Sequence, residues 1–110
     1  MTIKWVKVDP LVMNGEPFCF GTRLSVRNIL EMRAHGMTPA RMIAEHPELR
    51  RVGIAEAFRF AAENRVRYRD FFESDGSLRG GGFTADDAAD LPENLRTLRG
   101  VVVTPGAAGG

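Results

Sequence analysis

The sequence predicts a mainly α-helical protein with a short N-terminal β-ribbon, a trihelical helix-turn-helix bundle and a C-terminal extension. Three observations lead to this prediction. β-branched and aromatic residues are interspersed with lysines near the N-terminus, and an Asn-Gly turn signal follows them. Apolar residues then recur at three- and four-residue steps. Glycines and acidic residues are frequent in the last third of the chain.

Two short extended segments are expected to form the ribbon. Residues 3–8, Ile-Lys-Trp-Val-Lys-Val, are typical of a strand, and Asp9-Pro10 ends it. Asn14-Gly15 favours a turn. Residues 18–20, Phe-Cys-Phe, form the second segment, which Gly21 ends.

Capping signals mark the first two helices. Ser25 is a good N-cap for a helix over residues 26–35, and Gly36 supplies the left-handed residue that commonly ends a helix. Thr38 is expected to cap the second helix and Pro47 to stop it. Apolar residues of both helices follow helical spacing, which predicts that one stripe of each faces a core.

The third helix is predicted to be the longest, from about Arg51 to Phe72, with Ile54 and Phe58 on its apolar stripe. Its start lacks a good cap, because Arg50 and Arg51 stand where Ser, Thr or Asp is preferred. A local misfit of this kind sometimes marks a functional site. A frayed helix start is the structural alternative.

Charge is unevenly distributed along the chain. Residues 1–69 hold 12 Lys and Arg against 7 Asp and Glu, a net charge of +5, whereas residues 70–110 hold 3 Arg against 7 Asp and Glu, a net charge of −4. We therefore expect two parts: residues 1–72 as the ribbon and helical domain, and residues 73–110 as an acidic, partner-binding extension with a disordered end. The glycines at 80–82 are expected to form a flexible joint between them.

The sequence offers no carrier for catalysis. His35 and His46 do not have the spacing of a helical metal-binding pair, and neither a metal nor another cofactor is expected. Cys19 lies between two phenylalanines and is expected to be a small buried residue rather than a nucleophile. A lone cysteine, the absence of a signal-like N-terminus and the absence of a stretch of about 18 apolar residues favour a cytoplasmic protein without a membrane span.

The second and third predicted helices, joined by His46-Pro47-Glu48, match a helix-turn-helix arrangement. In that motif the first residues of the second helix of the pair meet base edges, and arginines hold guanines or phosphates. We expect DNA contacts from Arg50, Arg51, Arg59 and Arg65, with Ala55 and Glu56 on the same surface. A solvated helix face or a plain helical scaffold is the alternative.

Apolar residues of the last third are scattered among acids and glycines, too sparsely to form a core of their own. They are expected either to fold back on the bundle or to bind a partner protein, and the glycine joint favours the partner. The candidate partner-binding residues are Phe71, Phe72, Phe83, Leu91, Leu95 and Leu98.

Residues 15–26, Gly-Glu-Pro-Phe-Cys-Phe-Gly-Thr-Arg-Leu-Ser-Val, resemble the signature Gly-x-Pro-x-Ile-x-Gly-Thr-Arg-Ile-x-Val of the "433" family of domains of unknown function. The similarity covers roughly residues 5–65. It implies a homeodomain-like trihelical fold behind a β-ribbon, and a role like that of VapB-like antitoxins. Such a protein forms a homodimer, represses its own operon and blocks a PIN-like ribonuclease toxin through a C-terminal segment.

The chain also departs from the family pattern. Residues 50–53 read Arg-Arg-Val-Gly where the family has Thr-x-Glu-Asp, and the residues after Phe72 lie outside the pattern. Within the Gly-Thr-Arg element, Arg23 is expected to contact DNA phosphate or a dimer seam. In the structural alternative, Thr22 bonds backbone in a tight turn and Arg23 anchors a carboxylate such as that of Glu31 or Glu45.

Three functions remain open from the sequence. The leading expectation is an antitoxin that binds operator DNA and neutralises a ribonuclease toxin. The second is a stand-alone transcription regulator whose tail packs on its own body. The third is an adaptor subunit that binds only protein. Salt-dependent DNA binding separates the third from the other two.

Overall fold

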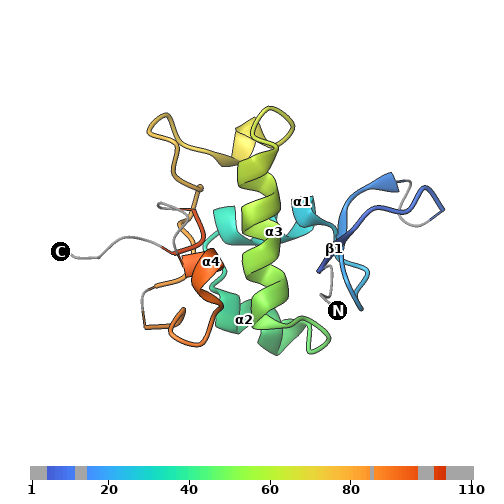
Figure 1. The fold of residues 1–110 in the computed structure, drawn as a ribbon, viewed down its shortest axis with the longest axis horizontal. Coiled ribbons are helices and arrows are strands. Elements are labelled where there is room, and N and C mark those ends of the chain that lie inside the picture. The colour runs from blue at the N-terminus through green and yellow to red at the C-terminus, as the bar shows by residue number, and fades with distance from the viewer. Residues whose placement is uncertain (1–4, 12–14, 85, 97–100, 104–110) are drawn as a thin grey trace.

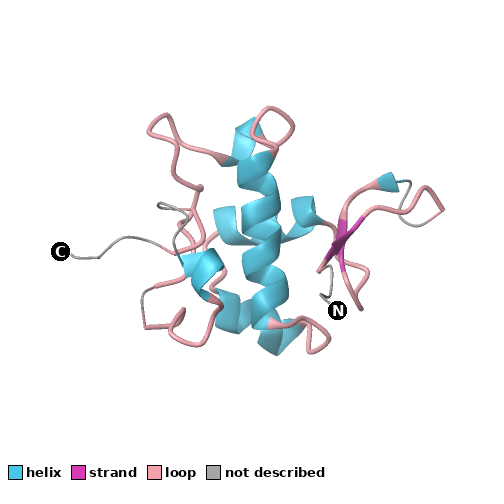
Figure 2. Cartoon of the chain, viewed as in Figure 1, coloured by secondary structure: helices cyan, strands magenta, loops and turns pink. Residues whose placement is uncertain are grey.

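The computed structural model describes residues 5–11, 15–84, 86–96 and 101–103, and within them the protein is mainly helical with one small sheet, as predicted (Figures 1 and 2). No helix among these residues has the length and apolar character needed to cross a membrane. The elements are β1 (Val6–Lys7), β2 (Phe18–Cys19), α1 (Val26–Ala34), α2 (Pro39–Glu45), α3 (Arg51–Glu63), the 3-10 helix η2 (Arg69–Phe71) and α4 (Glu93–Arg96).

The predicted ribbon is confirmed, in shorter form. β1 and β2 run antiparallel with Val6 opposite Cys19, and the N–H of Phe20 donates to the carbonyl of Trp5 at 2.8 Å. Residues 3 and 4 of the predicted 3–8 segment lie outside the described residues, and within residues 5–8 only Val6 and Lys7 are strand. The ribbon packs one face on α3, so tertiary contact supplies the stability that a two-stranded ribbon lacks alone.

The predicted helix caps are confirmed. The hydroxyl of Ser25 accepts from the N–H of Asn28 at 3.0 Å, and the side-chain oxygen of Asn28 accepts from the N–H of Ser25 at 3.0 Å, so the two form a capping box at α1. Gly36 follows α1 with a φ of 94°, the left-handed conformation expected there. Thr38 caps α2 by accepting from the N–H of Arg41 at 3.1 Å.

Helix α3 lies at the centre of the molecule, and α1, α2, α4 and both strands contact it (Figure 1). The glycine and alanine residues of α3 let the neighbouring elements approach closely, and Ile54 and Phe58 fill the space between α3 and these elements. The buried residues of α3 are Gly53, Ile54, Ala55, Ala57, Phe58 and Ala61.

The predicted length of the third helix is wrong: α3 ends at Glu63 rather than at Phe72. The side-chain amide of Asn64 donates to the carbonyl of Phe60 at 2.8 Å, and the N–H of Tyr68 bonds back to the carbonyl of Asn64 at 3.2 Å. This turn buries the ring of Tyr68 completely, edge-on to Phe60 at 6.2 Å between centroids. Ring burial in the core therefore decides where the helix stops.

The tail does not stand apart as an extension, which corrects the expected division after residue 72. Phe83, Leu91 and Leu95 are 1%, 4% and 1% exposed and belong to one core cluster with the helices. The ring of Phe83 meets that of Phe58 of α3 edge-on at 5.9 Å. These side chains pack on the body because α3 would otherwise leave an apolar side open to water.

The other candidate partner-binding residues follow the same pattern. Phe71 and Phe72 are partly buried and pack against the core cluster. Leu98 lies outside the described residues. In this structure the candidate side chains that are described therefore stabilise the chain's own fold instead of lining a docking surface.

The run of glycines at 80–82 serves close packing rather than a flexible joint. Gly80 has a φ of 85°, and a Cβ there would collide with the main-chain carbonyl of Arg33. A Cβ on Gly82 would collide with the carbonyl of Val102. The guanidinium of Arg33 also donates to the carbonyl of the middle glycine at 3.0 Å. Without a side chain, Gly80 lets the tail lie against α1, and Gly82 lets it pack against residues 101–102.

Replacing Phe83 tests whether the tail is part of the core. Phe83→Ala should lower the free energy of unfolding by about 3–5 kcal/mol, because a fully buried ring is lost and a cavity remains. Urea denaturation followed by circular dichroism measures the change. Val66→Ala is the matched control, since Val66 is 87% exposed. Equal unfolding midpoints for the two variants would contradict a shared core.

Candidate nucleic-acid interface

The start of α3 is an uncapped helix end. Leu49 is buried and its N–H donates to the carbonyl of His46 at 2.9 Å, which fixes the turn between α2 and α3. Arg50 is the N-cap residue, with extended backbone (φ −115°, ψ 149°) and no side-chain capping bond. The first turn carries no acidic residue. The first amides of α3 therefore keep the partial positive charge of a helix N-terminus.

The two arginines at this end differ in their surroundings. Arg50 is exposed, and its side chain has no hydrogen-bond or ion-pair partner among the described residues. Arg51 instead reaches the tail, where its guanidinium donates to the carbonyl of Asp87 at 2.9 Å and to the carboxylate of Asp90 at 3.2 Å. Both arginines lie at the start of α3, as expected, but the tail binds the side chain of Arg51 and not that of Arg50.

Arg59, the next predicted DNA contact, lies between two glutamates of its own helix. Its guanidinium is 3.4 Å from the carboxylate of Glu56 and 3.4 Å from that of Glu63. Ala55, expected on the same surface, is fully buried. The outward face of α3 is thus charge-compensated rather than cationic, which corrects the expectation of an arginine-rich helix face.

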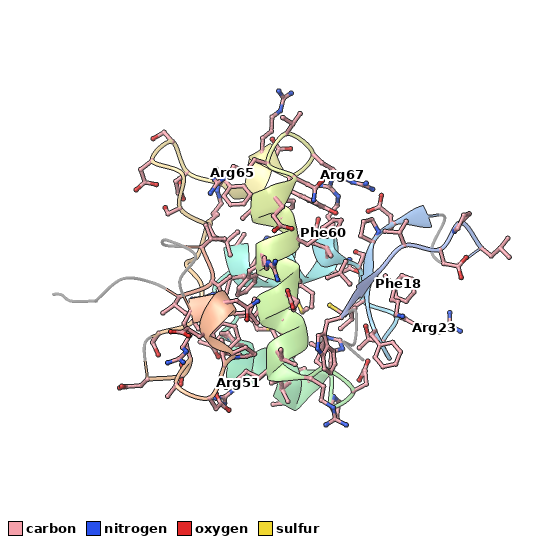
Figure 3. All side chains as sticks on the ribbon, viewed as in Figure 1. Phe18, Arg23, Arg51, Phe60, Arg65 and Arg67 are labelled. Atoms are coloured by element: carbon pink, nitrogen blue, oxygen red, sulfur yellow. The ribbon has the colours of Figure 1, made fainter. Side chains whose placement is uncertain are left out.

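Arg65 lies beyond the other end of α3, and Figure 3 shows Arg51 and Arg65 near opposite ends of that helix. The guanidinium of Arg65 donates to the carbonyl of Gly76 at 2.9 Å and stacks on the ring of Phe72 at 4.5 Å. Arg65 therefore holds the chain after η2 in place. It shares no surface with the start of α3, because the helix ends before it.

The Gly-Thr-Arg element forms a tight turn after β2. The hydroxyl of Thr22 donates to the carbonyl of Cys19 at 2.9 Å and accepts from the N–H of Leu24 at 3.0 Å, as expected for a backbone-bonding threonine. Arg23 is exposed and makes no ion pair within the described residues, so the expected link to Glu31 or Glu45 is wrong. Figure 3 shows Arg23 reaching outward on the ribbon side.

The ribbon meets the first turn of α3. An atom of the Trp5 ring lies within 3.6 Å of the position that a Cβ on Gly53 would take, and the thiol of Cys19 donates to the carbonyl of Gly53 at 3.8 Å. The turn that carries Arg23 and the turn that carries Arg50 thus belong to elements that join at this point. Arg50 stands at the uncapped helix end and Arg23 in the turn after β2, and both are exposed.

Sequence reasoning missed the tail residues that bind Arg51. Asp87 and Asp90 lie 36 and 39 positions further along the chain, so no local pattern links them to the start of α3. Their only signal is the acidic character of the tail. The ion pair between Arg67 and Glu16 at 3.1 Å was missed for the same reason, since 51 positions separate its members.

Two buried groups have raised pKa values. Burial raises the pKa of the Cys19 thiol to about 12, which agrees with the expected role of a small buried residue rather than a nucleophile. Burial also raises the pKa of the Tyr68 hydroxyl. Neither group provides an ionised nucleophile at neutral pH.

A family model described as "Protein of unknown function (DUF433)" matches residues 6–61. The match covers the ribbon, α1, α2 and nearly all of α3, which is just over half of the chain. None of the curated proteins and none of the solved structures compared with the chain matches it.

The raised pKa of Cys19 makes stability depend on alkaline pH. The folded thiol keeps its proton up to about pH 12, whereas an unfolded thiol with the ordinary pKa of 9.0 loses it earlier. The unfolded state therefore binds fewer protons in this window, and the free energy of unfolding should fall as pH rises from about 9. Urea titrations across this range should show a steeper fall for the natural chain than for Cys19→Ala, and parallel curves would refute the effect.

Proposed function

The chain belongs to the DUF433 family of proteins of unknown function, and we propose that it is a DNA-binding transcription regulator of the helix-turn-helix type. In this proposal α2 and α3 are the helix pair and the first residues of α3 approach the DNA. One observation carries the proposal: α3 starts uncapped, and an exposed arginine without a partner, Arg50, stands at its N-cap.

The groups at the start of α3 are suited to bind phosphate. Free backbone amides and the helix dipole attract an anion, and an arginine adds a charge-assisted bond. Arg23, in the turn after β2 of the ribbon that packs on α3, is a second exposed arginine without an ion pair among the described residues. Because Glu56 and Glu63 compensate Arg59, the outward face of α3 contributes less cationic charge to base recognition than the sequence implied. Phosphate contacts therefore supply most of the proposed affinity.

The packed tail supports the regulator over the antitoxin. An antitoxin of the expected kind uses apolar anchors of its C-terminal segment to fill a toxin's site, and here the anchors Phe83, Leu91 and Leu95 are core residues. A regulator whose tail packs on its own body needs no such anchors.

Arg50→Ala tests the DNA-binding surface. The substitution should weaken binding to duplex DNA across all sequences tested and lower the slope of log K against log salt by about 1, because one phosphate contact is lost. Fluorescence anisotropy at several salt concentrations measures both quantities.

Arg41→Ala is the control for this test. Arg41 is also an exposed arginine, but its guanidinium lies 2.8 Å from the Glu45 carboxylate on the same helix. Equal affinity and equal salt slope for the two variants would refute the assignment of Arg50.

The antitoxin role remains a second candidate because of one feature of the tail. The carboxylate-bearing residues Asp86, Asp87 and Glu93 are all exposed, and the tail buries its apolar side chains beneath them. An acidic surface of this kind suits the basic cleft of a PIN-like ribonuclease, by charge and without insertion of apolar anchors.

Neutralising these acids tests the second candidate. A chain with Asp86→Asn, Asp87→Asn and Glu93→Gln should lose a co-purifying small basic ribonuclease from the native host while it keeps its unfolding midpoint and DNA affinity. Ribonuclease assays on the purified complexes and mass spectrometry give the readout. Retention of the ribonuclease by the neutralised chain would rule out capture through this surface.

A further inference from the structure

The aromatic residues of the chain fall into two groups. The sequence contains one Trp, one Tyr and seven Phe. Six of these nine belong to the core cluster or pack against it, and all six lie in α3 or after it. The other three, Trp5, Phe18 and Phe20, lie in the ribbon or directly beside it and are not part of that core. Burial in the core therefore does not account for the three rings of the ribbon.

These three rings share one face of the ribbon. Lys7 stands opposite Phe18 in the register of the two strands, and the bond from the N–H of Phe20 to the carbonyl of Trp5 continues the pairing by one residue. Opposite residues of a ribbon point to the same face, and successive residues alternate between faces. Cys19, which contacts α3, therefore marks the inner face. The outer face carries Trp5, Lys7, Phe18 and Phe20.

The outer face presents its rings to solvent. The side chain of Phe20 is 47% exposed, and Trp5 and Phe18 are half-buried. The rings of Trp5 and Phe20 meet edge-on, with centroids 6.2 Å apart and planes at 79°. Phe18 and Phe20 are two residues apart, which is about 7 Å along a strand. The face therefore offers separate aromatic surfaces on which successive bases of one strand can stack.

Two cations accompany these rings. The ammonium of Lys7 lies 5.2 Å from the centre of the Phe20 ring. Arg23 follows three residues after Phe20, and Figure 3 shows it reaching outward on the ribbon side. Both cations are exposed and form no ion pair within the described part of the chain. The acids of this segment are engaged elsewhere, since Asp9 accepts from a main-chain N–H at 2.9 Å and Glu16 pairs with an arginine of the body at 3.1 Å.

We propose that the outer face of the ribbon binds the unpaired bases of a single-stranded nucleic acid. Trp5, Phe18 and Phe20 stack on the bases, and Lys7 and Arg23 contact the phosphates. The bases of a duplex stack on one another and present only their edges in the grooves, so free base faces are found in single strands. This site does not depend on the duplex contact proposed for α3.

The make-up of the face favours a nucleic acid over an apolar protein partner. Its side chains are three rings and a lysine, with no aliphatic residue among them. An apolar partner would remove Lys7 from water without giving its charge a counterpart, which is costly. A single strand supplies a phosphate for the lysine and a base for each ring, so it satisfies every group of the face.

Fluorescence of Trp5 provides a direct measurement, because it is the single tryptophan of the chain. A thymidine strand of about ten nucleotides should quench this fluorescence at low salt, since a base stacks on the indole. An abasic strand of the same length has the same phosphates but no bases. It should bind about tenfold more weakly, as measured by fluorescence anisotropy of labelled strands. A uridine strand is the RNA arm, and the tighter of the two base-bearing strands identifies DNA or RNA as the ligand.

Substitutions of Phe20 separate stacking from simple apolar contact. Phe20→Leu keeps an apolar side chain without a ring and should raise the Kd for the thymidine strand by about tenfold, whereas Phe20→Tyr keeps the ring and the affinity. Lys7→Ala should lower the slope of log K against log salt by about 0.7, because one phosphate contact is lost. Val66→Ala, an exposed apolar residue outside the ribbon, is the control. Circular dichroism checks that each variant is folded.

The two nucleic-acid contacts fail separately in these measurements. Phe20→Leu should leave the affinity for duplex DNA unchanged, whereas Arg50→Ala should lower it. Equal affinities for the thymidine and abasic strands, unquenched Trp5 fluorescence, an unchanged Kd in Phe20→Leu, or equal losses in Phe20→Leu and Phe20→Tyr each overturn the ribbon site. Absence of binding to both base-bearing strands at low salt does so as well.

Discussion

The burial of α3 on several sides is the constraint from which the rest of the structure follows. The helix carries apolar residues on more than one stripe, so α1 and α2 alone leave part of it uncovered. The ribbon covers its first turn, and Phe83 of the tail closes on Phe58. Each of these elements is too short or too sparse in apolar residues to be stable without α3. The family-matched region and the tail therefore share one core.

This packing also determines which charges are available. At the start of α3, the guanidinium of Arg51 donates to a backbone carbonyl of the tail and to the Asp90 carboxylate. Beyond the other end of the helix, Arg65 binds a carbonyl of the chain after η2, and Arg67 binds Glu16 next to the ribbon. Arg23, in the turn after β2, and Arg50, at the start of α3, are exposed and have no side-chain partner within the described part of the chain. Most arginines of the basic body are thus bound within the fold, and Arg50 at the start of α3 is the residue on which the proposed DNA contact rests.

Local signals predicted the fold well where the interaction is itself local. The caps at Ser25 and Thr38 depend on residues three positions away, so the sequence suffices for them. The two ribbon strands were each predicted from their own residues, whereas Asn14 of the predicted turn lies outside the described residues. The same reasoning failed for the end of α3. The stripe of three- and four-residue steps runs on past Glu63, yet burying the Tyr68 ring requires the chain to turn back.

The sequence by itself determined the helical class, the N-terminal ribbon, the positions of the first two helices and the family, because these depend on periodicity, capping residues and a contiguous motif. Only the tertiary structure decided where the tail lies and which arginines are free. Both depend on contacts between residues 36 to 51 positions apart, as between Arg51 and Asp87 or Arg67 and Glu16, and such contacts leave no periodic trace in the chain. The tail packs on α3 because the helix would otherwise expose an apolar side to water. A sequence pattern does not show which segment of the chain will cover that side.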